Sequence, residues 1–178
     1  NRRVLFIEDY LPQRAIGAGF PRSNDIVRTM VDMLGAHVTV YPIFPPRSQP
    51  MTRYQDFPDR AEIIWDRGLG DLAAFLRTRA GYYDIIWIGR THNADRLKPI
   101  FTACETALAG CRVVLDTEAL TALRLQGRMQ IMGQTDLPDL EGMLRYELRN
   151  TDFIDRFVTV SKGEATLIRG IVDQDVSV

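Results

Sequence analysis

Asp-Ile-Ile-Trp-Ile-Gly, residues 84–89, is the stretch that decides the fold of this chain. Four successive apolar side chains in so short a run predict a strand that is buried on both faces. Similar runs lie on either side of it in the sequence, at residues 4–7, 37–41, 62–65, 112–116 and 157–160. Helical patterns separate these runs, so the sequence predicts an α/β domain. We expect a Rossmann-like, doubly wound and mostly parallel sheet of six to seven strands with helices on both faces.

The composition is that of an ordinary globular domain, with 46% hydrophobic and 25% charged residues. The 22 basic and 23 acidic residues give a formal net charge of -1, which argues against a general nucleic-acid-binding protein. No apolar run approaches the ~20 residues that span a bilayer, and the apolar part of the first residues is too short for a signal peptide. We therefore expect a cytoplasmic protein.

Cysteine and histidine are too few and too widely placed to predict a metal site. Cys104 and Cys111 lack the spacing of metal ligands, and His37 and His92 are far apart in the sequence. Buried thiols in a reducing compartment are the expected state of the two cysteines. His37 begins a predicted strand at the opposite edge of the sheet, so we assign it a structural role.

Two glycines lie between the first predicted strand and the first predicted helix. Gly17 and Gly19 allow a close approach of the backbone to a ligand, and the helix N-terminus behind them favours an anion. A flexible surface loop is the alternative. The loop lacks the third glycine of a dinucleotide fingerprint, and no Gly-Lys-Ser/Thr follows it as in a P-loop. Ser23 or Asn24 is the expected cap of this helix, and Asp71 and Ser161 are the expected caps of two later helices.

Polar residues follow the later strands, where a parallel sheet binds its ligands. Arg90, His92 and Asn93 come directly after the strand at 84–89. A histidine in that place can accept a proton or bond to a sugar hydroxyl or phosphate; capping or packing is the alternative. Glu118 follows the strand at 112–116, where a carboxylate binds hydroxyl groups or caps a helix. Arg14, Arg22 and Arg90 together would make the mouth of the cleft locally basic.

Five segments in order resemble the N-terminal domain of family 4-type glycosyltransferases with the GT-B architecture. They extend over nearly the whole chain, and the last contains a Val-Ser-x-x-Glu-Ala type ending; the segments are residues 4–12, 25–40, 83–94, 112–120 and 157–165. In that family two Rossmann-like domains face each other across a cleft. The resemblance implies that residues 1–178 form the acceptor-side domain. The segment 157–178 ends by opening a new strand, so we expect a C-terminal donor domain beyond it.

The same resemblance implies the chemistry of the site. The donor would be a nucleotide-sugar acting as co-substrate, with no metal or other cofactor, and the transfer would retain the anomeric configuration. The acceptor would be a carbohydrate or a lipid- or protein-linked group, and peripheral membrane association stays open. The resemblance places Gly17 and Gly19 near the donor diphosphate, His92 near the transferred sugar and Glu118 near the acceptor. The loop lacks the adjacent Gly-Gly pair that is common in the family.

Two other functions stay open at the level of the sequence. A phospho-receiver domain would use the acidic pair Glu8-Asp9, Asp66 as the phosphoacceptor and Lys162 as the terminal lysine, with Thr91 or Thr117 as the switch hydroxyl. A sugar- or nucleotide-binding module without catalysis is the third reading. The downstream reading frame would distinguish the three.

Overall fold

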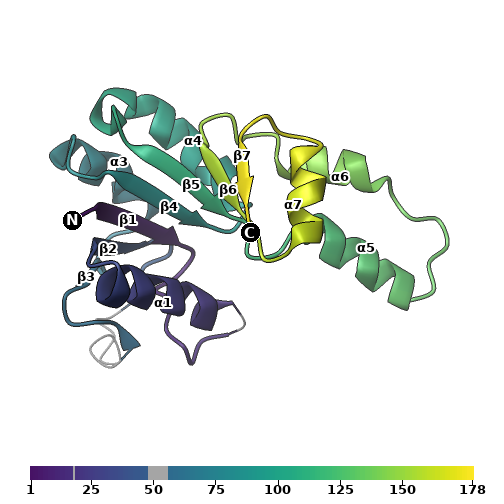
Figure 1. Cartoon of the computed structure of the whole chain (residues 1–178), viewed down its shortest axis with the longest axis horizontal. Helices are drawn as coiled ribbons and strands as arrows, with labels where there is room; N and C mark the ends of the chain where they lie inside the picture. Colours follow the sequence, from purple (N-terminus) through teal and green to yellow (C-terminus); the bar gives the residue numbers. More distant parts are fainter. Residues whose placement is uncertain (18, 48–55) are drawn as a thin grey trace.

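The computed structural model describes residues 1–17, 19–47 and 56–178, and it confirms the predicted α/β fold (Figure 1). In these residues seven strands form one sheet in the order β3-β2-β1-β4-β5-β6-β7, and every neighbouring pair is parallel. The strands are β1 (Arg3–Glu8), β2 (His37–Pro42), β3 (Glu62–Ile63), β4 (Ile85–Gly89), β5 (Arg112–Asp116), β6 (Arg156–Val158) and β7 (Asp175–Ser177).

Helices connect the strands and lie on both faces of the sheet. In Figure 1, α1 lies on one side of the sheet while α3 and α4 lie on the other, and α5 and α6 extend away from it. The helices are α1 (Phe20–Arg28), α3 (Leu69–Thr78), α4 (Asn93–Ala103), α5 (Thr121–Ile131), α6 (Leu140–Glu147) and α7 (Lys162–Arg169). A π-helical turn (Thr29–Met33) continues α1, and a 3₁₀ turn (Glu105–Leu108) follows α4.

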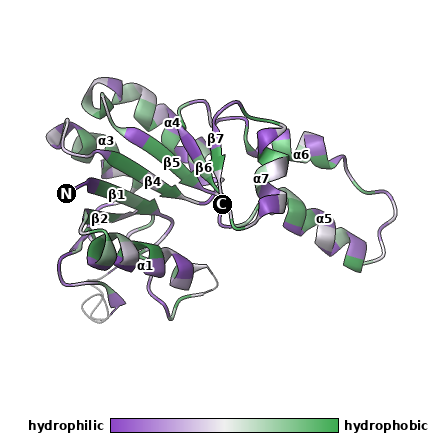
Figure 2. Ribbon diagram, in the orientation of Figure 1, coloured by the Kyte–Doolittle hydropathy of each residue, from purple (hydrophilic) through white to green (hydrophobic). Residues whose placement is uncertain are grey.

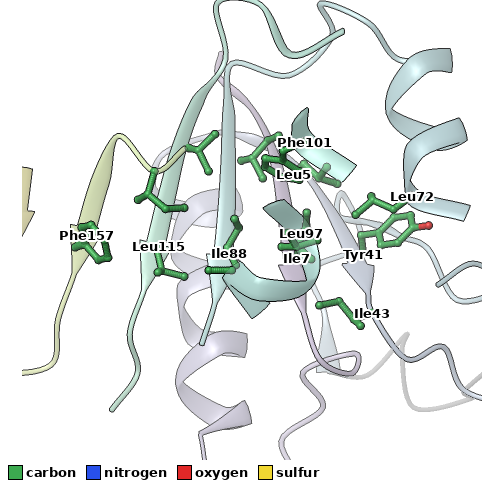
Figure 3. Close-up of a cluster of buried hydrophobic side chains, with 14 of the residues drawn as sticks. Leu5, Ile7, Tyr41, Ile43, Leu72, Ile88, Leu97, Phe101, Leu115 and Phe157 are labelled. Atoms are coloured by element: carbon green, nitrogen blue, oxygen red, sulfur yellow. The ribbon is translucent and has the colours of Figure 1, made fainter. Parts of the chain in front are cut away.

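The alternation of side chains along β1 divides the core into two layers. Leu5 and Ile7 point into the layer that packs against α3 and α4, part of which Figure 3 shows. Val4 and Phe6 point the other way and pack with Val27 of α1. Each strand near the centre is thus buried on both faces, which explains why its sequence is a continuous apolar run.

Two helices begin earlier than the sequence predicted. Ser23 and Asn24 do not cap α1, which begins at Phe20 with Gly19 as its N-cap; both are buried inside the helix. Pro21 is tolerated there because the first turn of a helix leaves its N–H groups unpaired. Asp71, the expected cap of α3, lies in its first turn and accepts a hydrogen bond from the Gly68 backbone at 3.1 Å.

The structure confirms the predicted cap of α7 and shortens the predicted third strand. The Ser161 hydroxyl caps α7 by accepting from the Glu164 backbone N–H at 3.1 Å. The strand expected at 62–65 is limited to β3, and Trp65 and Trp87 are partly buried against the α1 layer. Residues 48–55, within the proline-rich segment 42–60, lie outside the described residues, as does Ala18.

Candidate functional site at the carboxyl ends of β1, β4 and β5

The sheet has a topological switch point between β1 and β4. From β1 the chain first adds β2 and β3 on one side, and it then returns to add β4 to β7 on the other. A crevice forms at the carboxyl ends of the strands at such a point, because the connections leave in opposite directions. Glu8 and Asp9 end β1 there, the turn from Arg90 to His92 follows β4, and Glu118 follows β5.

Glu8 is a fully buried carboxylate at the end of β1. It accepts hydrogen bonds of 2.8 Å from the Ser23 hydroxyl and from Arg90 Nε. Gly89 makes room for it, since a Cβ at this position would lie 2.6 Å from Glu8 Oε2. Burial raises the pKa of Glu8 above its ordinary value, although the Arg90 charge and the hydrogen bonds oppose the shift.

Arg90 joins the acidic groups of the neighbouring strand ends. Its Nε lies 2.8 Å from Glu8, 3.2 Å from Glu118 and 3.6 Å from Asp9, and its guanidinium lies 4.7 Å from the centre of the Phe20 ring. Its backbone φ of 71° is uncommon for a residue other than glycine, so these contacts hold the turn after β4 in a strained conformation. Its buried Nη2 makes no hydrogen bond to any residue that the structure describes.

Glu118 packs against the first turn of α1. A Cβ at Gly19 would lie 1.5 Å from Glu118 Oε1, and Gly19 has a φ of 92° that favours glycine. The space beside Gly19 is therefore taken by a carboxylate of this chain, whereas the sequence led us to expect it open for a diphosphate. Gly17 is more open, since a Cβ there would meet only the Phe20 ring, at 3.7 Å. Burial raises the pKa of Glu118, although the Arg90 charge opposes the shift.

The basic mouth that the sequence indicated is neutralised by ion pairs. Arg22 of α1 pairs with the buried Asp116, and Arg14 pairs with Asp25. Arg90 pairs with the carboxylates described above. The arginines at the cleft therefore serve first to balance acidic side chains.

His92 and Asp9 form a pair across the switch point. His92 Nε2 lies 2.9 Å from both carboxylate oxygens of Asp9, and the imidazole is 45% exposed. Burial would raise the pKa of Asp9, but the hydrogen bond and charge of His92 outweigh it and hold that pKa below its ordinary value. When the ring is neutral, Nε2 holds the proton because it faces a carboxylate, and Nδ1 is the acceptor. His92 is the N-cap residue of α4, yet its ring makes no capping hydrogen bond within the described backbone.

A cavity of about 610 Å³ adjoins this pair, and its size is that of a small-molecule site. It lies between α4, α5 and α6, with His92 and Thr91 in its wall. Glu147 of α6 fixes one side, because its carboxylate accepts hydrogen bonds of 2.9 Å from the Thr121 and Ala122 backbones and a further one from the Thr91 hydroxyl.

Asn93 differs from the other predicted site residues. Its side chain is fully buried, donates to the Gly89 carbonyl at 2.8 Å and accepts from Arg96 at 2.8 Å. These bonds shape the turn from β4 into α4, so we assign Asn93 to that turn and correct the expectation that it binds substrate. Glu147 was missed as a site residue, because only the packing of α6 brings it to the site. Asp9 entered the sequence analysis only in the acidic pair of a phospho-receiver, because its pairing with His92 depends on the strand order.

The chain was compared with known proteins at the level of sequence and of structure. Neither a family model nor a curated protein sequence matches it. The chain is similar to sucrose-phosphate synthase from Thermosynechococcus elongatus, with a TM-score of 0.56 and 12% identity over 100% of this chain and 47% of that protein. It is similar as well to a wide-type short-chain dehydrogenase/reductase from Veillonella parvula DSM 2008, solved in complex with NADP. That match has a TM-score of 0.51 and 10% identity over 89% of this chain and 68% of the other.

At these identities the likenesses show the fold alone, which is Rossmann-like. The chain spans about half the length of the sucrose-phosphate synthase that it matches. Of the helices that the structure describes, none is both long enough and apolar enough to span a membrane.

Proposed function

We propose that this chain is the acceptor-side domain of a two-domain GT-B glycosyltransferase. The observation that carries the proposal is the Asp9–His92 pair at the switch point, because it borders a cavity of small-molecule size. The likeness to sucrose-phosphate synthase, a GT-B glycosyltransferase, supports the proposal because it covers the whole chain. A C-terminal donor domain would complete the cleft.

In the proposed reaction a sugar moves from a nucleotide-sugar to an acceptor hydroxyl. The acceptor oxygen bonds to the anomeric carbon, the hydroxyl loses its proton, and the bond to the diphosphate breaks with its electron pair. Asp9 holds the ring of His92 so that Nδ1 accepts the hydrogen bond of the acceptor hydroxyl and assists loss of its proton. The donor would need no metal, and the anomeric configuration would be retained, as in the family that the sequence resembles.

The groups around His92 would bind the substrates. Glu118 would accept hydrogen bonds from acceptor hydroxyls, and Arg90 would hold that carboxylate in place through their ion pair. Gly17 and Gly19, which precede α1, would lie toward the donor side. Most of the stabilisation of the leaving diphosphate would come from the donor domain, so this chain alone should transfer no sugar.

A dinucleotide-dependent oxidoreductase is the second candidate, because of the likeness to the short-chain dehydrogenase/reductase. Rossmann domains hold a pyrophosphate at the N-terminus of the first helix. Here the carboxylate of Glu118 lies against Gly19 at that helix terminus, and Glu8 is buried behind it. Negative charge in this place repels a pyrophosphate, which counts against a dinucleotide at this helix terminus and equally against a donor diphosphate beside Gly19.

A phospho-receiver function finds little support in the geometry. Asp66 follows the edge strand β3, and β2 separates β3 from the acidic residues that end β1. Among the described residues, no three His, Cys, Asp or Glu side chains are placed to hold a metal ion together. A binding module without catalysis remains distinct from the proposal, because it predicts no transfer by the intact protein.

The proposal is tested by sugar transfer with the intact protein that contains this chain. Nucleotide-sugars and glycoside acceptors are incubated in pairs, and products are measured by mass spectrometry. His92→Ala should lower turnover about 100-fold, the lower range for a lost acid–base group. His37→Ala is the control, because that histidine is exposed at the start of β2. Transfer that is unchanged in His92→Ala, or absent from the intact wild-type protein with every pair, contradicts the proposal.

A further inference from the structure

The wall of the cavity beside His92 is mostly apolar. Ala122 and Leu125 of α5 face Met143 and Tyr146 of α6 across it. Leu125 is 47% exposed and Tyr146 is 68% exposed, so both offer apolar surface to a ligand. Figure 2 shows hydrophobic residues on α5, which extends away from the sheet.

The carboxylates in the wall already have partners. Glu147 accepts from the backbones of Thr121 and Ala122 and from the Thr91 hydroxyl. Asp95 pairs with Arg149 and accepts from the Asn150 amide at 2.7 Å. Both carboxylates are thus held in place by bonds within the protein, and each keeps some acceptor capacity for a sugar hydroxyl.

The one arginine or lysine side chain in the described wall of the cavity is engaged as well. Arg149 pairs with Asp95, donates to the Tyr146 carbonyl and lies 3.8 Å from the centre of the Tyr146 ring. A phosphate group would need a free cation at hydrogen-bond distance. The wall therefore suits an apolar group better than an anionic one.

We infer that the acceptor is a sugar with an apolar aglycone, such as an aryl or alkyl group, and not a phosphorylated sugar. The aglycone lies between Leu125 and Tyr146, while a sugar hydroxyl meets His92. This inference rests on the proposed function and adds the class of acceptor to it. An aryl group suits the site because it packs against the Tyr146 ring and the Leu125 side chain.

The inference is tested by measuring the binding of small probes to the purified chain. Isothermal titration calorimetry gives the affinities, and ligand-observed NMR detects weak binding. The probes are methyl and p-nitrophenyl glycosides of glucose, galactose and mannose, together with the three corresponding sugar 6-phosphates and sugar-free p-nitrobenzyl alcohol. At least one p-nitrophenyl glycoside should bind ten times more tightly than its methyl counterpart and the 6-phosphate. Leu125→Glu should weaken that binding at least tenfold. Ile131→Glu, on the same helix but outside the cavity and 89% exposed, should leave it unchanged.

The other outcomes distinguish a failure of the inferred acceptor class from a failure of the proposed glycosyltransferase function. If a methyl glycoside or a 6-phosphate binds as tightly as the aryl glycoside, or if Leu125→Glu binds like the wild type, the apolar acceptor is wrong while the proposed function stands. If p-nitrobenzyl alcohol binds as well as the aryl glycosides, the apolar site is real but its role as a sugar-acceptor site is wrong. If none of the probes binds, the inference is wrong.

Discussion

Glu8 places an ionisable group in the interior beside the proposed site. Its raised pKa means that the folded chain binds this proton more tightly than the unfolded chain. The contribution of Glu8 to the unfolding free energy is then lost as the pH rises from the ordinary glutamate pKa of about 4.3 through the higher pKa of the folded state. Glu8→Gln keeps the shape, and the Ser23 hydroxyl can reverse to accept from the new amide.

We therefore expect the unfolding free energy of Glu8→Gln to rise relative to wild type as the pH increases through that interval. Urea unfolding at a series of pH values from 4 to 8 measures the difference. If the difference in unfolding free energy between Glu8→Gln and wild type is the same at every pH, Glu8 has the same pKa in the folded and unfolded chains.

Gly19 allows the Glu118 carboxylate to lie against α1. Gly19→Ala adds a Cβ in a strained backbone region and displaces that carboxylate, so we expect a loss of about 2–4 kcal/mol in unfolding free energy. Gly81→Ala is the matched control, because Gly81 has a φ of 67° and open space around its Cβ; its cost should be about 1 kcal/mol. When Glu118→Ala is also present, Gly19→Ala and Gly81→Ala should lower the unfolding free energy by similar amounts. Similar losses in the chain that retains Glu118 would show that Glu118 does not pack against Gly19.

At the scale of elements, Glu147 connects α6 to α5 and to the turn after β4. Its carboxylate accepts from the first backbone N–H groups of α5 and from the Thr91 hydroxyl, so it acts as a cap supplied by another helix. Glu147 therefore helps to hold the start of α5 beside His92.

Glu147→Ala should lower the unfolding free energy by about 1–2 kcal/mol, the cost of losing a helix cap. Hydrogen exchange should speed up at Thr121 and Ala122, which lose their acceptor. Glu141→Ala removes an exposed carboxylate of α6 that pairs only with Arg145 among the residues that the structure describes, and it should cost about 0.5 kcal/mol or less. Equal exchange rates at the α5 amides in both variants would show that Glu147 does not hold the helix.

For the whole molecule, the sequence was sufficient to predict the sheet. The strands β1 and β2 are buried on both faces, while β4 and β5 are fully buried on one face and partly buried on the other, and their apolar runs reflect this burial. The rule that parallel strands present their carboxyl ends together then placed His92 and Glu118 at one edge. The apolar run of a strand and the position of a residue just after it can both be read from a short stretch of sequence.

Contacts that depend on strand order or on helix packing could not be predicted. The Asp9–His92 pair requires β1 to neighbour β4, although 83 residues separate the two side chains in the sequence. Glu118 fills the space beside Gly19 because β5 ends opposite α1, which no local pattern indicates. The start of α1 was misplaced because Ser23 looks like a cap in the sequence but bonds to Glu8 in the structure.

The central claim is that the switch point between β1 and β4 binds a sugar acceptor. The most direct test is an NMR titration of the ¹⁵N-labelled chain with methyl and p-nitrophenyl glycosides, and separately with NADP. We predict that at least one glycoside shifts the amide signals of Thr91 and His92, that His92→Ala abolishes these shifts, and that His37→Ala keeps them. Shifts with NADP at the first turn of α1, and none with any glycoside at His92, would contradict the account and favour a dinucleotide-binding domain.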